Sequence, residues 1–417
     1  MQSSHSQEMT SPLAVVGGVY RERCRLPNGT DETWGSGGRA AAVIAGLGLK
    51  VTLHTAVDVR TASLLASLAH AFHFETVEVN VKRTRQFRYD HGLSSPIIWP
   101  PVDPSEILHL EVDAENALVF GMLEATADVR AKRVVYDPQN PLAPESFKFA
   151  SGLSPHIAYV LNGSEARRLV GVDDPVEGAG RIASEFGVEV VVVKQGPRGA
   201  LVYENGRYEH IPAYKTESIW PIGSGDVFAA VFAARWAGQN LSAIEAAMHA
   251  SRAAALYVNN RVLPISSEEI ETTSGFPFAP LVMTDKALAD REYHVYLAGP
   301  FFNIAQRWLV EESRLALQGM GLRVFSPLHD IGLGSGRDVA PQDVEGLKRC
   351  RAILALVDGL DAGTIFEVGY ARSLEKPVVA LAESTPEEPL KMITGTGCDV
   401  VSDFVTALYR VAWAARA

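Results

Sequence analysis

Two apolar patterns alternate along this 417-residue chain and predict an α/β fold. Short unbroken apolar runs are typical of buried strands, and the segments between them space their apolar residues at helical intervals. Strands that alternate with helices form parallel sheets covered by helices on both faces. In the first part of the chain the predicted strands are Leu13–Gly18, Val51–His54, Arg133–Asp137, Ile157–Leu161 and Val188–Val193.

Other segments complete a first predicted domain. Gly37–Gly48 has the pattern of a helix closed by glycine. Ala200–Ile211 is a predicted hairpin, because Asn205-Gly206 tolerates the positive φ angles of a tight primed turn. Phe74–His91 and Pro96–Val102 look like polar-faced strands that could form a lid. Two further helices are predicted, one from Ile222 to about Gly238 and one over Leu241–Val258.

The same alternation returns near the end of the chain and predicts a second, smaller domain. Residues 268–291 lack apolar periodicity and contain Thr, Ser, Gly and Pro, which suits a linker. We therefore predict domains at 12–272 and 292–417, joined by a linker at 273–291. The second domain has predicted strands Tyr293–Ala298, Leu322–Phe325, Ala352–Val357 and Pro377–Leu381 and predicted helices Ala305–Leu317, Ile365–Leu374, Phe404–Ala415 and one from about Gln342.

Acidic residues follow the predicted strand Ala352–Val357. Asp361 lies just beyond it, and Glu367 falls in the first turn of the next helix. Ligands of open α/β sheets bind at the carboxyl ends of the strands, so Glu367 would project into that crevice, where a carboxylate can attack an anomeric carbon. A plainer interpretation is a capping box, in which Thr364 caps the helix and Glu367 bonds back to its backbone.

A second group with chemical content is Gly223-Ser224-Gly225-Asp226, at the start of a predicted helix. Glycines there let backbone amides point at one spot, where the helix dipole favours a transferring phosphoryl group. Asp226 could accept a hydroxyl proton during that transfer. The plainer interpretation is a glycine turn followed by a favourable acidic residue at the start of a buried helix.

Composition narrows the classes of partner. The net charge is −11, from 49 acidic and 38 basic residues, so a nucleic-acid polymer is not an expected partner. The basic stretch Lys82–Arg88 is then a solvated lid face. Three scattered cysteines, no apolar run that could span a bilayer and no signal-peptide core in Met1–Ser11 predict a cytoplasmic protein with a disordered start. The histidines lack zinc-ligand spacing.

The motifs after residue 292 resemble the nucleoside 2-deoxyribosyltransferase family. Tyr296-Leu-Ala-Gly-Pro-Phe-Phe302 is similar to its start, and Asp361-Ala-Gly-Thr-Ile-Phe-Glu-Val-Gly-Tyr-Ala371 is similar to its core. The resemblance implies a five-stranded flavodoxin-like domain and retaining chemistry, with a base as acceptor for transfer or water for hydrolysis. It also implies the following roles: Glu367 as nucleophile, Asp361 as proton donor to the base, Asp343 as a base or sugar contact, and Tyr296, Gly299 and Phe301 as pocket lining.

One departure from that family leaves the substrate open. Related transferases tend to carry an Asn, shared with a neighbouring subunit, in the loop after the last strand, whereas this chain has Lys391 nearby. A lysine could instead meet a 5′-phosphate, so hydrolysis of nucleoside monophosphates stays an alternative. The Phe301-Phe302 loop looks more like that of the nucleoside-type enzymes.

Residues 12–272 resemble the ribokinase-like (PfkB-type) carbohydrate and nucleoside kinases. The resemblance is carried by Gly223-Ser-Gly-Asp226 with a following Phe, by Leu161-Asn-Gly-Ser-Glu165 and by Val192-Val-Lys-Gln-Gly-Pro-Arg-Gly-Ala200. It implies ATP and Mg²⁺ as cofactors and a parallel sheet with a small lid. The implied roles are Asp226 as catalytic base, Gly223, Ser224 and Gly225 as the anion hole, Lys194 and Asn162 as cofactor contacts, and Glu165 at the metal.

The sugar pocket departs from this family more than the phosphate site does. Arg39 stands where a substrate-contacting Asn is expected, and Glu22 stands near the usual Asp. We therefore expect a kinase of an unusual sugar or nucleoside fused to a deoxyribosyltransferase or N-glycosidase, acting on small molecules as a homo-oligomer away from membranes. Two alternatives stay open: a glycosidase with a degenerate kinase half, and a nucleotide-binding sensor without catalysis.

Overall fold

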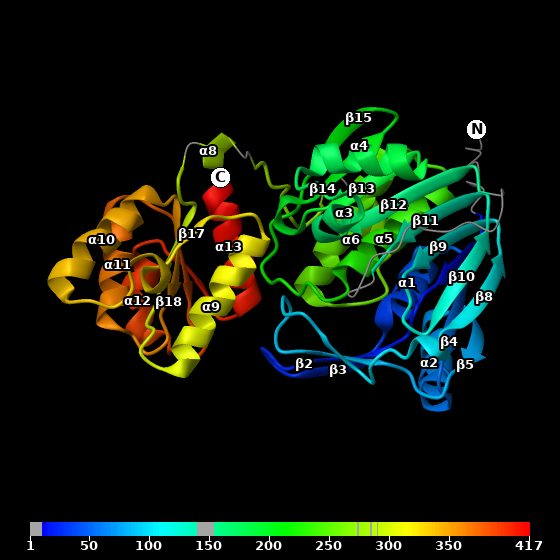
Figure 1. Cartoon of the computed structure of the whole chain (residues 1–417), viewed down its shortest axis with the longest axis horizontal. Coiled ribbons are helices and arrows are strands. Elements are labelled where there is room, and N and C mark those ends of the chain that lie inside the picture. Colours follow the sequence, from blue (N-terminus) through cyan, green and yellow to red (C-terminus); the bar gives the residue numbers. More distant parts are fainter. Residues whose placement is uncertain (1–10, 140–153, 273–274, 284–285, 290) are drawn as a thin grey trace. The chain divides into compact units, whose positions relative to one another are not determined.

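The chain divides into two compact units, which are drawn in Figure 1. The structure is a computed structural model that describes residues 11–139, 154–272, 275–283, 286–289 and 291–417. The first unit holds the residues up to Thr216 and Trp220–Pro280, and the second holds Glu217–Ile219 and Leu281–Ala417. The start predicted to be disordered lies outside the described residues except for Ser11, as do parts of the predicted linker. The predicted domain boundaries stay a prediction.

A nine-stranded sheet forms the centre of the first unit, in the order β15-β14-β13-β12-β11-β9-β1-β4-β5. The strands from β5 to β13 pair in parallel, while β14 and β15 add an antiparallel edge. The bounds are β1 Leu13–Val16, β4 Val51–Val57, β5 Glu75–Asn80, β9 Asn116–Phe120, β11 Arg133–Asp137, β12 His156–Asn162, β13 Val190–Lys194, β14 Ala200–Glu204 and β15 Arg207–Ile211.

Both faces of this sheet are buried. Leu13 and Val15 pack with apolar residues of α1, α5 and α6, while Ala14 and Val16 pack in a second cluster with residues of α3 and α4. Successive strand residues point to opposite faces, so one unbroken apolar run serves both clusters. The helices are α1 Gly35–Gly46, α2 Val59–Phe72, α3 Gly163–Val170, α4 Pro175–Phe186, α5 Ser224–Ala233, α6 Ala243–Asn260 and α7 Ser267–Glu271.

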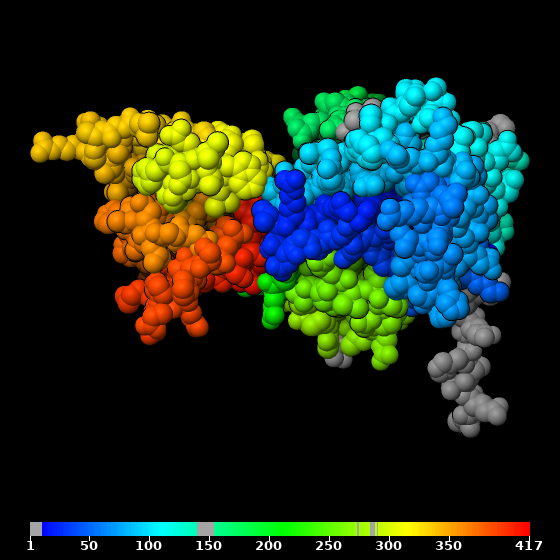
Figure 2. All heavy atoms as spheres, turned by 90° about the horizontal axis from the view of Figure 1, so that it is seen from below, coloured from blue at the N-terminus to red at the C-terminus, as the bar shows by residue number. Residues whose placement is uncertain are grey.

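A separate four-stranded sheet, in the order β3-β2-β6-β7, forms the lid. Its strands are β2 Arg21–Cys24, β3 Thr30–Thr33, β6 Gln86–Tyr89 and β7 Ile97–Trp99. Figure 2 shows its first two strands in dark blue at the surface of the first unit. Part of the predicted lid lies elsewhere: β5 pairs in parallel with β4, because α2 between them makes a crossover connection. The lid strands β2 and β3 were not predicted, because they are polar and contain no apolar run.

Local predictions agree with the observed turns and helices. Asn205 and Gly206 have φ angles of 50° and 79°, as a primed turn requires, and they join β14 to β15. The long predicted helix from Ile222 is α5 followed by a π-helical turn over Ala234–Gly238. A small parallel pair, β8 Leu108–Asp113 and β10 Ala125–Arg130, lies apart from both sheets, and short 3₁₀ turns cover Pro104–Glu106 and Gly196–Arg198.

The second unit is a five-stranded, wholly parallel sheet in the order β17-β16-β18-β19-β20, as in a flavodoxin-like domain. The strand pattern had located four of these strands, and the fifth, β20, spans only Asp399–Val401. The other strands are β16 Val295–Ala298, β17 Val324–Phe325, β18 Ala352–Leu356 and β19 Val378–Leu381. The helices are α8 Lys286–Ala289, α9 Ile304–Gly319, α10 Gly336–Arg349, α11 Ala362–Ser373, α12 Lys391–Gly395 and α13 Phe404–Arg416, with a π turn at Pro327–Ile331 and a 3₁₀ turn at Glu388–Leu390.

Candidate active sites in the two units

Asp226 lies in the first turn of α5. The residue just before this helix is Gly223, and no other residue type fits at that position. Gly223 has a φ of 85°, in the left-handed region, and a Cβ there would lie 2.3 Å from the Nε atom of Arg39. No side chain caps this helix, and the hydroxyl of Ser224 donates to the carbonyl of Pro221 at 2.8 Å. The Ser224 amide also donates to this carbonyl, at 3.0 Å, so the amides of the next residues in the first turn remain for an anion.

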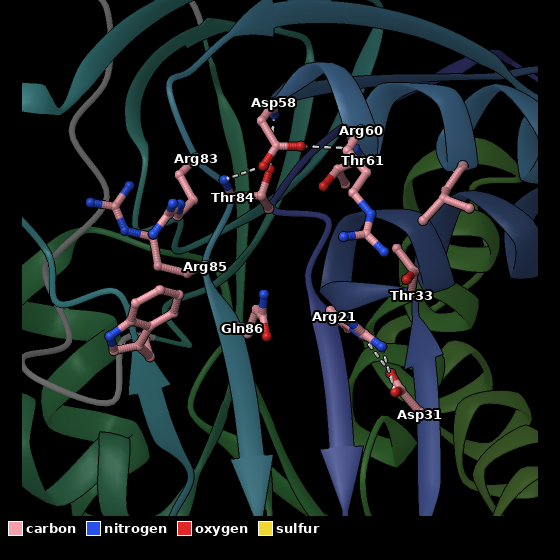
Figure 3. A pocket seen from close by; sticks show the side chains of 12 residues that line it. Arg21, Asp31, Thr33, Asp58, Arg60, Thr61, Arg83, Thr84, Arg85 and Gln86 are labelled. Carbon is pink, nitrogen blue, oxygen red and sulfur yellow. Dashed lines mark hydrogen bonds and ion pairs between the residues drawn. The ribbon is translucent and has the colours of Figure 1, made fainter.

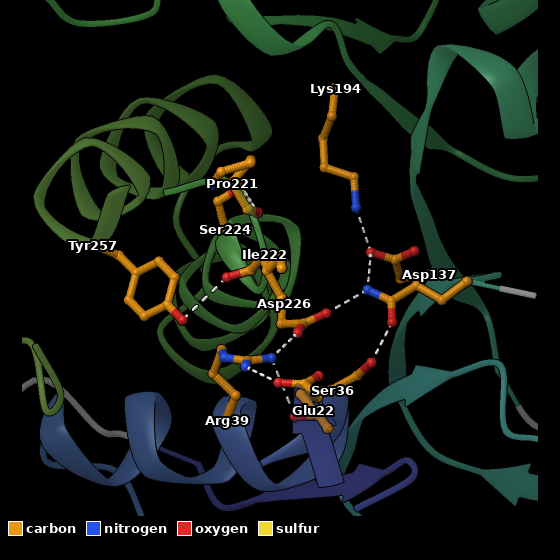
Figure 4. A network of polar contacts seen from close by, with 12 residues as sticks. Glu22, Ser36, Arg39, Asp137, Lys194, Pro221, Ile222, Ser224, Asp226 and Tyr257 are labelled. Atoms are coloured by element: carbon orange, nitrogen blue, oxygen red, sulfur yellow. Dashed lines mark hydrogen bonds and ion pairs between the residues drawn. The ribbon is translucent and has the colours of Figure 1, made fainter. Parts of the chain in front are cut away.

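The Asp226 carboxylate is held on both of its oxygens. Arg39 donates to Oδ2 and Gln139 donates to Oδ1, each at 2.5 Å. A second branch of the Arg39 guanidinium donates to Glu22 on β2, so one buried arginine joins two carboxylates (Figure 4). Thus the structure brings together three residues that the sequence analysis assigned to the acceptor side of this site.

Burial controls the electrostatics of this group. The Arg39 side chain is only 1% exposed, and its Nε has no acceptor within the described chain. Burial raises the pKa of Glu22, although Arg39 opposes that shift. Removing one member of a buried pair leaves the other charge uncompensated, at a cost of about 3–5 kcal/mol. Arg39 is therefore a structural part of this site as well as a candidate ligand contact.

Lys194 brings a cation to the start of α5. It ends β13, and its ammonium donates to Asp137 at the end of β11. Its Nζ lies 3.4 Å from the position that a Cβ on Gly225 would take. Burial raises the pKa of Asp137 to about 7, against the effect of Lys194, and nearby carboxylates including Glu165 raise the pKa of Lys194 in spite of its burial. A lysine beside a helix start without a side-chain cap is an arrangement that favours an anion.

Asn162 and Glu165 form a reciprocal cap on α3. The Asn162 side chain accepts from the amides of Ser164 and Glu165, and the Glu165 carboxylate accepts from the Asn162 amide at 2.7 Å. Burial raises the pKa of Glu165, and Lys194 opposes this shift. The described residues contain no group of three or more His, Cys, Asp or Glu side chains that could hold a metal ion. Mg²⁺ that is bound to phosphates takes only one or two carboxylate ligands and keeps several waters. Glu165 and Asp137 fit this kind of Mg²⁺ site and no other.

Gln139, which the sequence pattern did not single out, contacts Asp226 directly. The Gln139 side chain also accepts a hydrogen bond from the hydroxyl of Ser36 on α1. Its signal was present, because Asp137-Pro-Gln139 follows a predicted buried strand at the carboxyl edge of the sheet.

Glu367 is the centre of the polar group in the second unit. The hydroxyl of Tyr296 on β16 donates to its Oε1 at 2.5 Å. Burial raises the pKa of Glu367 to about 7, and the charges of Asp343 and Asp361 add to this, while the Tyr296 hydrogen bond lowers it. Burial and the charge of Glu367 keep the pKa of Tyr296 above its usual range, so its hydroxyl stays a donor. Glu367 therefore lies among other acids and next to a neutral hydroxyl donor.

Asp343 on α10 has an unused acceptor. Its Oδ1 is buried and accepts no hydrogen bond from any described residue. Burial also raises the pKa of Asp343, and its charge acts on both Glu367 and Tyr296. A buried carboxylate oxygen without a donor is costly. A sugar hydroxyl in this position would satisfy it.

Asp361 caps α11, so the interpretation of Thr364 as the cap is wrong. The Asp361 Oδ2 accepts from the amide and the hydroxyl of Thr364, at 2.9 and 3.0 Å. Thr364 is thus the third residue of the helix, and Glu367 lies one turn later, where it contacts Tyr296 instead of the backbone at the helix start. The cap leaves Glu367 available for chemistry.

Gly299, Phe301 and Lys391, which the sequence analysis also named, each have a contact within the second unit. A Cβ on Gly299 would lie 3.0 Å from Leu356, so this glycine permits close packing at the strand ends. The carbonyl of Phe301 accepts from Arg307, and its ring lies 5.5 Å from that of Phe302. Lys391 is exposed and paired with Glu388 at 2.6 Å.

Comparisons with known proteins agree with this division. Residues 58–269 match the family model described as pfkB family carbohydrate kinase, and residues 295–399 match the model described as nucleoside 2-deoxyribosyltransferase. The cytidine kinase of Thermococcus kodakarensis is 25% identical over 244 residues, which cover 53% of this chain and 87% of that protein. None of the described helices is long and apolar enough to cross a membrane.

Solved structures of two sugar kinases are also similar to this chain. A fructokinase double mutant from Vibrio cholerae, with fructose, ADP and potassium bound, is 16% identical and has a TM-score of 0.49, with 63% of this chain and 98% of that one covered. Ribokinase from Thermotoga maritima is 18% identical, with a TM-score of 0.42 and coverage of 60% and 93%. By its family matches, the chain belongs to the pfkB family of carbohydrate kinases and carries a nucleoside 2-deoxyribosyltransferase domain after the kinase domain.

Proposed function

We propose that the second unit cleaves or transfers an N-glycosidic bond with Glu367 as nucleophile. The observation that carries this proposal is the pair formed by Glu367 and Tyr296, with the unused Oδ1 of Asp343 in the same group. The Tyr296 hydroxyl occupies Oε1 of Glu367, which leaves Oε2 for attack on the anomeric carbon. The match of residues 295–399 to the deoxyribosyltransferase model supports the same class of reaction.

The proposed reaction has two steps, each of which exchanges one bond at the anomeric carbon. In the first, Glu367 Oε2 forms an ester bond to that carbon while the bond to the base breaks. Asp361 is proposed to protonate the leaving base through Oδ1, because the helix cap uses only Oδ2. In the second step a nitrogen of another base, or water, attacks the same carbon, the Glu367 carboxylate leaves, and Asp361 takes back the proton that the attacking group loses. Asp343 is proposed to hold a sugar hydroxyl throughout.

For the first unit we propose phosphorylation of a hydroxyl group on a sugar or nucleoside. The arrangement of Lys194, the Gly223–Gly225 turn and Asp226 at one helix start supports this. When bound, ATP with Mg²⁺ supplies the phosphoryl group. Lys194 and the amides of the turn would hold its negative charge, and Asp226 would accept the proton of the acceptor hydroxyl.

The acceptor hydroxyl must first gain access to Asp226. One oxygen is held by Arg39 in a buried ion pair, and the other is held by the neutral amide of Gln139. A hydrogen bond to a charged group is worth about 1.5–3 kcal/mol, whereas breaking a buried pair costs about 3–5 kcal/mol. The acceptor is therefore proposed to replace Gln139 at Oδ1, with Arg39 remaining on Oδ2.

One observation favours a second function for the first unit, nucleotide binding without turnover. With both oxygens occupied, Asp226 is not free to act as a base in this conformation. If the contacts of Arg39 and Gln139 persist when substrates bind, the unit would bind a nucleotide at the Gly223 turn and phosphorylate nothing. This is the degenerate kinase half anticipated from the departures at Glu22 and Arg39.

A chromatographic screen tests these proposals together. The full chain is incubated with nucleosides, nucleoside monophosphates and sugars, with and without ATP and Mg²⁺. Release or exchange of a base without ATP supports the second unit's assignment, and a phosphorylated acceptor that appears only with ATP supports the kinase. ATP binding by calorimetry without any phosphorylated product would establish the nucleotide-binding alternative. No base release or exchange from any nucleoside or nucleotide would contradict the glycosidic assignment.

A further inference from the structure

A pocket in the first unit is not explained by either proposed activity. Its volume is 590 Å³, and it lies between the lid strands β2 and β6 and the start of α2 (Figure 3). Pockets of this size accommodate metabolites. Its lining includes Arg21, Asp58, Arg60, Arg83 and Arg85.

The pocket lies on the opposite face of the lid sheet from the Asp226 group. Arg21 and Glu22 are neighbours on β2, so their side chains point to opposite faces. Glu22 reaches Arg39, whereas Arg21 lines the pocket together with its cross-strand partners Thr33 and Gln86. The pocket is therefore separate from the acceptor position beside Asp226.

The lining has an excess of positive charge. Four arginines and two aspartates line it, which gives a net formal charge of +2 in a chain whose net charge is −11. Both aspartates are engaged by other groups. Asp31 accepts from Arg21 and Arg23 at 2.6–2.8 Å, and Asp58 accepts from the amides of Thr61 and Thr84. The charge of +2 counts both acids as ionised, and Asp31 is shared with Arg23, which lies outside the lining, as does Glu124 beside Arg85.

Three of the arginines offer unused donors. Within the described chain, Arg60 makes no hydrogen bond or ion pair, and the guanidinium of Arg83 contacts only the ring of Trp99, at 5.0 Å. The buried Nε of Arg85 has no acceptor, although its Nη1 lies 3.7 Å from Glu124. In Figure 3, Arg60 and Arg83 lie on either side of Asp58. A buried donor without an acceptor is costly, so this pocket is built for an anion.

We propose that this pocket binds the phosphate monoester of a small molecule. A monoester carries a charge of about −1.5 to −2 at neutral pH and three acceptor oxygens, which matches the +2 charge and the several free donors better than a single carboxylate does. The exposed ring of Trp99 and the side chain of Leu64, also on the lining, offer apolar surface to the organic part. The same phosphate chemistry could come from inorganic phosphate, which the experiment distinguishes.

Calorimetry on the full chain tests the proposal, with ribose 5-phosphate, AMP, inorganic phosphate, ribose and adenosine as probes. We expect a phosphorylated probe to bind more tightly than its unphosphorylated counterpart and than inorganic phosphate, with an affinity that falls as salt is added. The exposed double variant Arg60→Gln/Arg83→Gln should weaken that binding at least tenfold. Arg88→Gln, on the lid strand β6 but outside the pocket lining, is the matched control and should leave the affinity unchanged.

Two further variants separate this pocket from the other phosphate sites. Lys194→Gln alters the phosphate site of the first unit, and Tyr296→Phe alters the site of the second; neither should change the affinity for the phosphorylated probe. Unchanged binding in the arginine double variant would overturn the proposal, as would loss of binding in Lys194→Gln or Tyr296→Phe. Inorganic phosphate binding as tightly as the monoesters would also overturn it, since the organic part would then contribute nothing.

Discussion

The two candidate catalytic carboxylates have opposite surroundings. Asp226 is tied on both oxygens, by the cation of Arg39 and by the amide of Gln139. Glu367 receives one hydrogen bond, from the neutral hydroxyl of Tyr296, and its charged neighbours are other acids, which together with burial raise its pKa to about 7. Glu367 can therefore react without first losing a hydrogen-bond partner. Asp226 can react only after one of its two partners has moved away.

This difference separates a site that is ready for chemistry from one that depends on rearrangement. Nucleophilic attack by Glu367 requires only its ionised form and an empty Oε2. Proton transfer to Asp226 requires that an acceptor displace a hydrogen bond first. Variants at the two sites should therefore differ in the size of their effects and in how they depend on pH.

Replacing the nucleophile should have the largest effect. Glu367→Gln keeps the size of the side chain and can still accept from Tyr296, but an amide cannot form the ester intermediate. We expect base release or exchange to fall by at least about 10³-fold while phosphoryl transfer is unchanged. Rates come from single-turnover assays with the best nucleoside of the screen.

The matched control for this variant is Glu345→Gln on α10, because Glu345 is exposed and, among the residues that the structure describes, pairs with Lys348 alone. It should keep the full rate of base release. Wild-type activity in Glu367→Gln would remove Glu367 from the mechanism and leave Asp343 as the alternative nucleophile.

Removing the candidate base of the kinase should have the next largest effect. Asp226→Asn keeps a hydrogen-bond acceptor but loses basicity, so phosphoryl transfer should fall by about 10²–10⁴-fold. Base release at Glu367 should persist. ATP consumption in the presence of the acceptor is the measurement, with Asp173→Asn at an exposed position as the control. A rate unchanged by Asp226→Asn would favour the nucleotide-binding scaffold.

The sequence predicted the positions of these carboxylates better than their partners. Glu367 comes after a buried parallel strand, which the apolar pattern reveals, whereas Asp226 was located by a glycine turn at the start of a predicted helix. Their partners come from distant segments: Arg39 lies 187 residues from Asp226, and Tyr296 lies 71 residues from Glu367. Tyr296 belongs to a motif that resembles the transferase family, whereas Gln139 belongs to no such motif.

The fold shows the same limit. Strong apolar runs predicted most strands of both large sheets, because burial on two faces requires them. The lid strands β2 and β3 are polar and short, and their pairing depends on contacts between strands that are distant in sequence. At the start of α11 the cap is Asp361 and not Thr364. A local capping motif can therefore fit two positions in the sequence, and the pattern alone does not choose between them.

The pH dependence of base release should follow the ionisation of Glu367. Because the carboxylate is the nucleophile and its pKa is raised to about 7, kcat/KM should be low in acid and rise through pH 7. At pH 6 the rate should be about tenfold below that of the fully ionised Glu367. A pH profile of base release with a midpoint near 4.5 would contradict this assignment.

Tyr296→Phe sharpens that test. The Tyr296 hydrogen bond lowers the pKa of Glu367, so its loss should move the midpoint of the profile to higher pH. A role for Tyr296 in packing alone would lower the rate at every pH without moving the midpoint.

The smallest expected effect concerns Gln139, and it tests how the acceptor reaches Asp226. If the acceptor hydroxyl replaces the Gln139 amide at Oδ1, Gln139→Ala removes a competitor, and the KM for the acceptor should fall by about twofold to tenfold, equivalent to at most about 1.4 kcal/mol. Ser36→Ala removes only the hydroxyl that holds Gln139, so it should change KM in the same direction and by less. Steady-state kinetics at saturating ATP measure both variants. A rise in KM would mean that Gln139 binds the acceptor itself, and Arg39 would then be the group that has to move, because Asp226 has no third oxygen to offer.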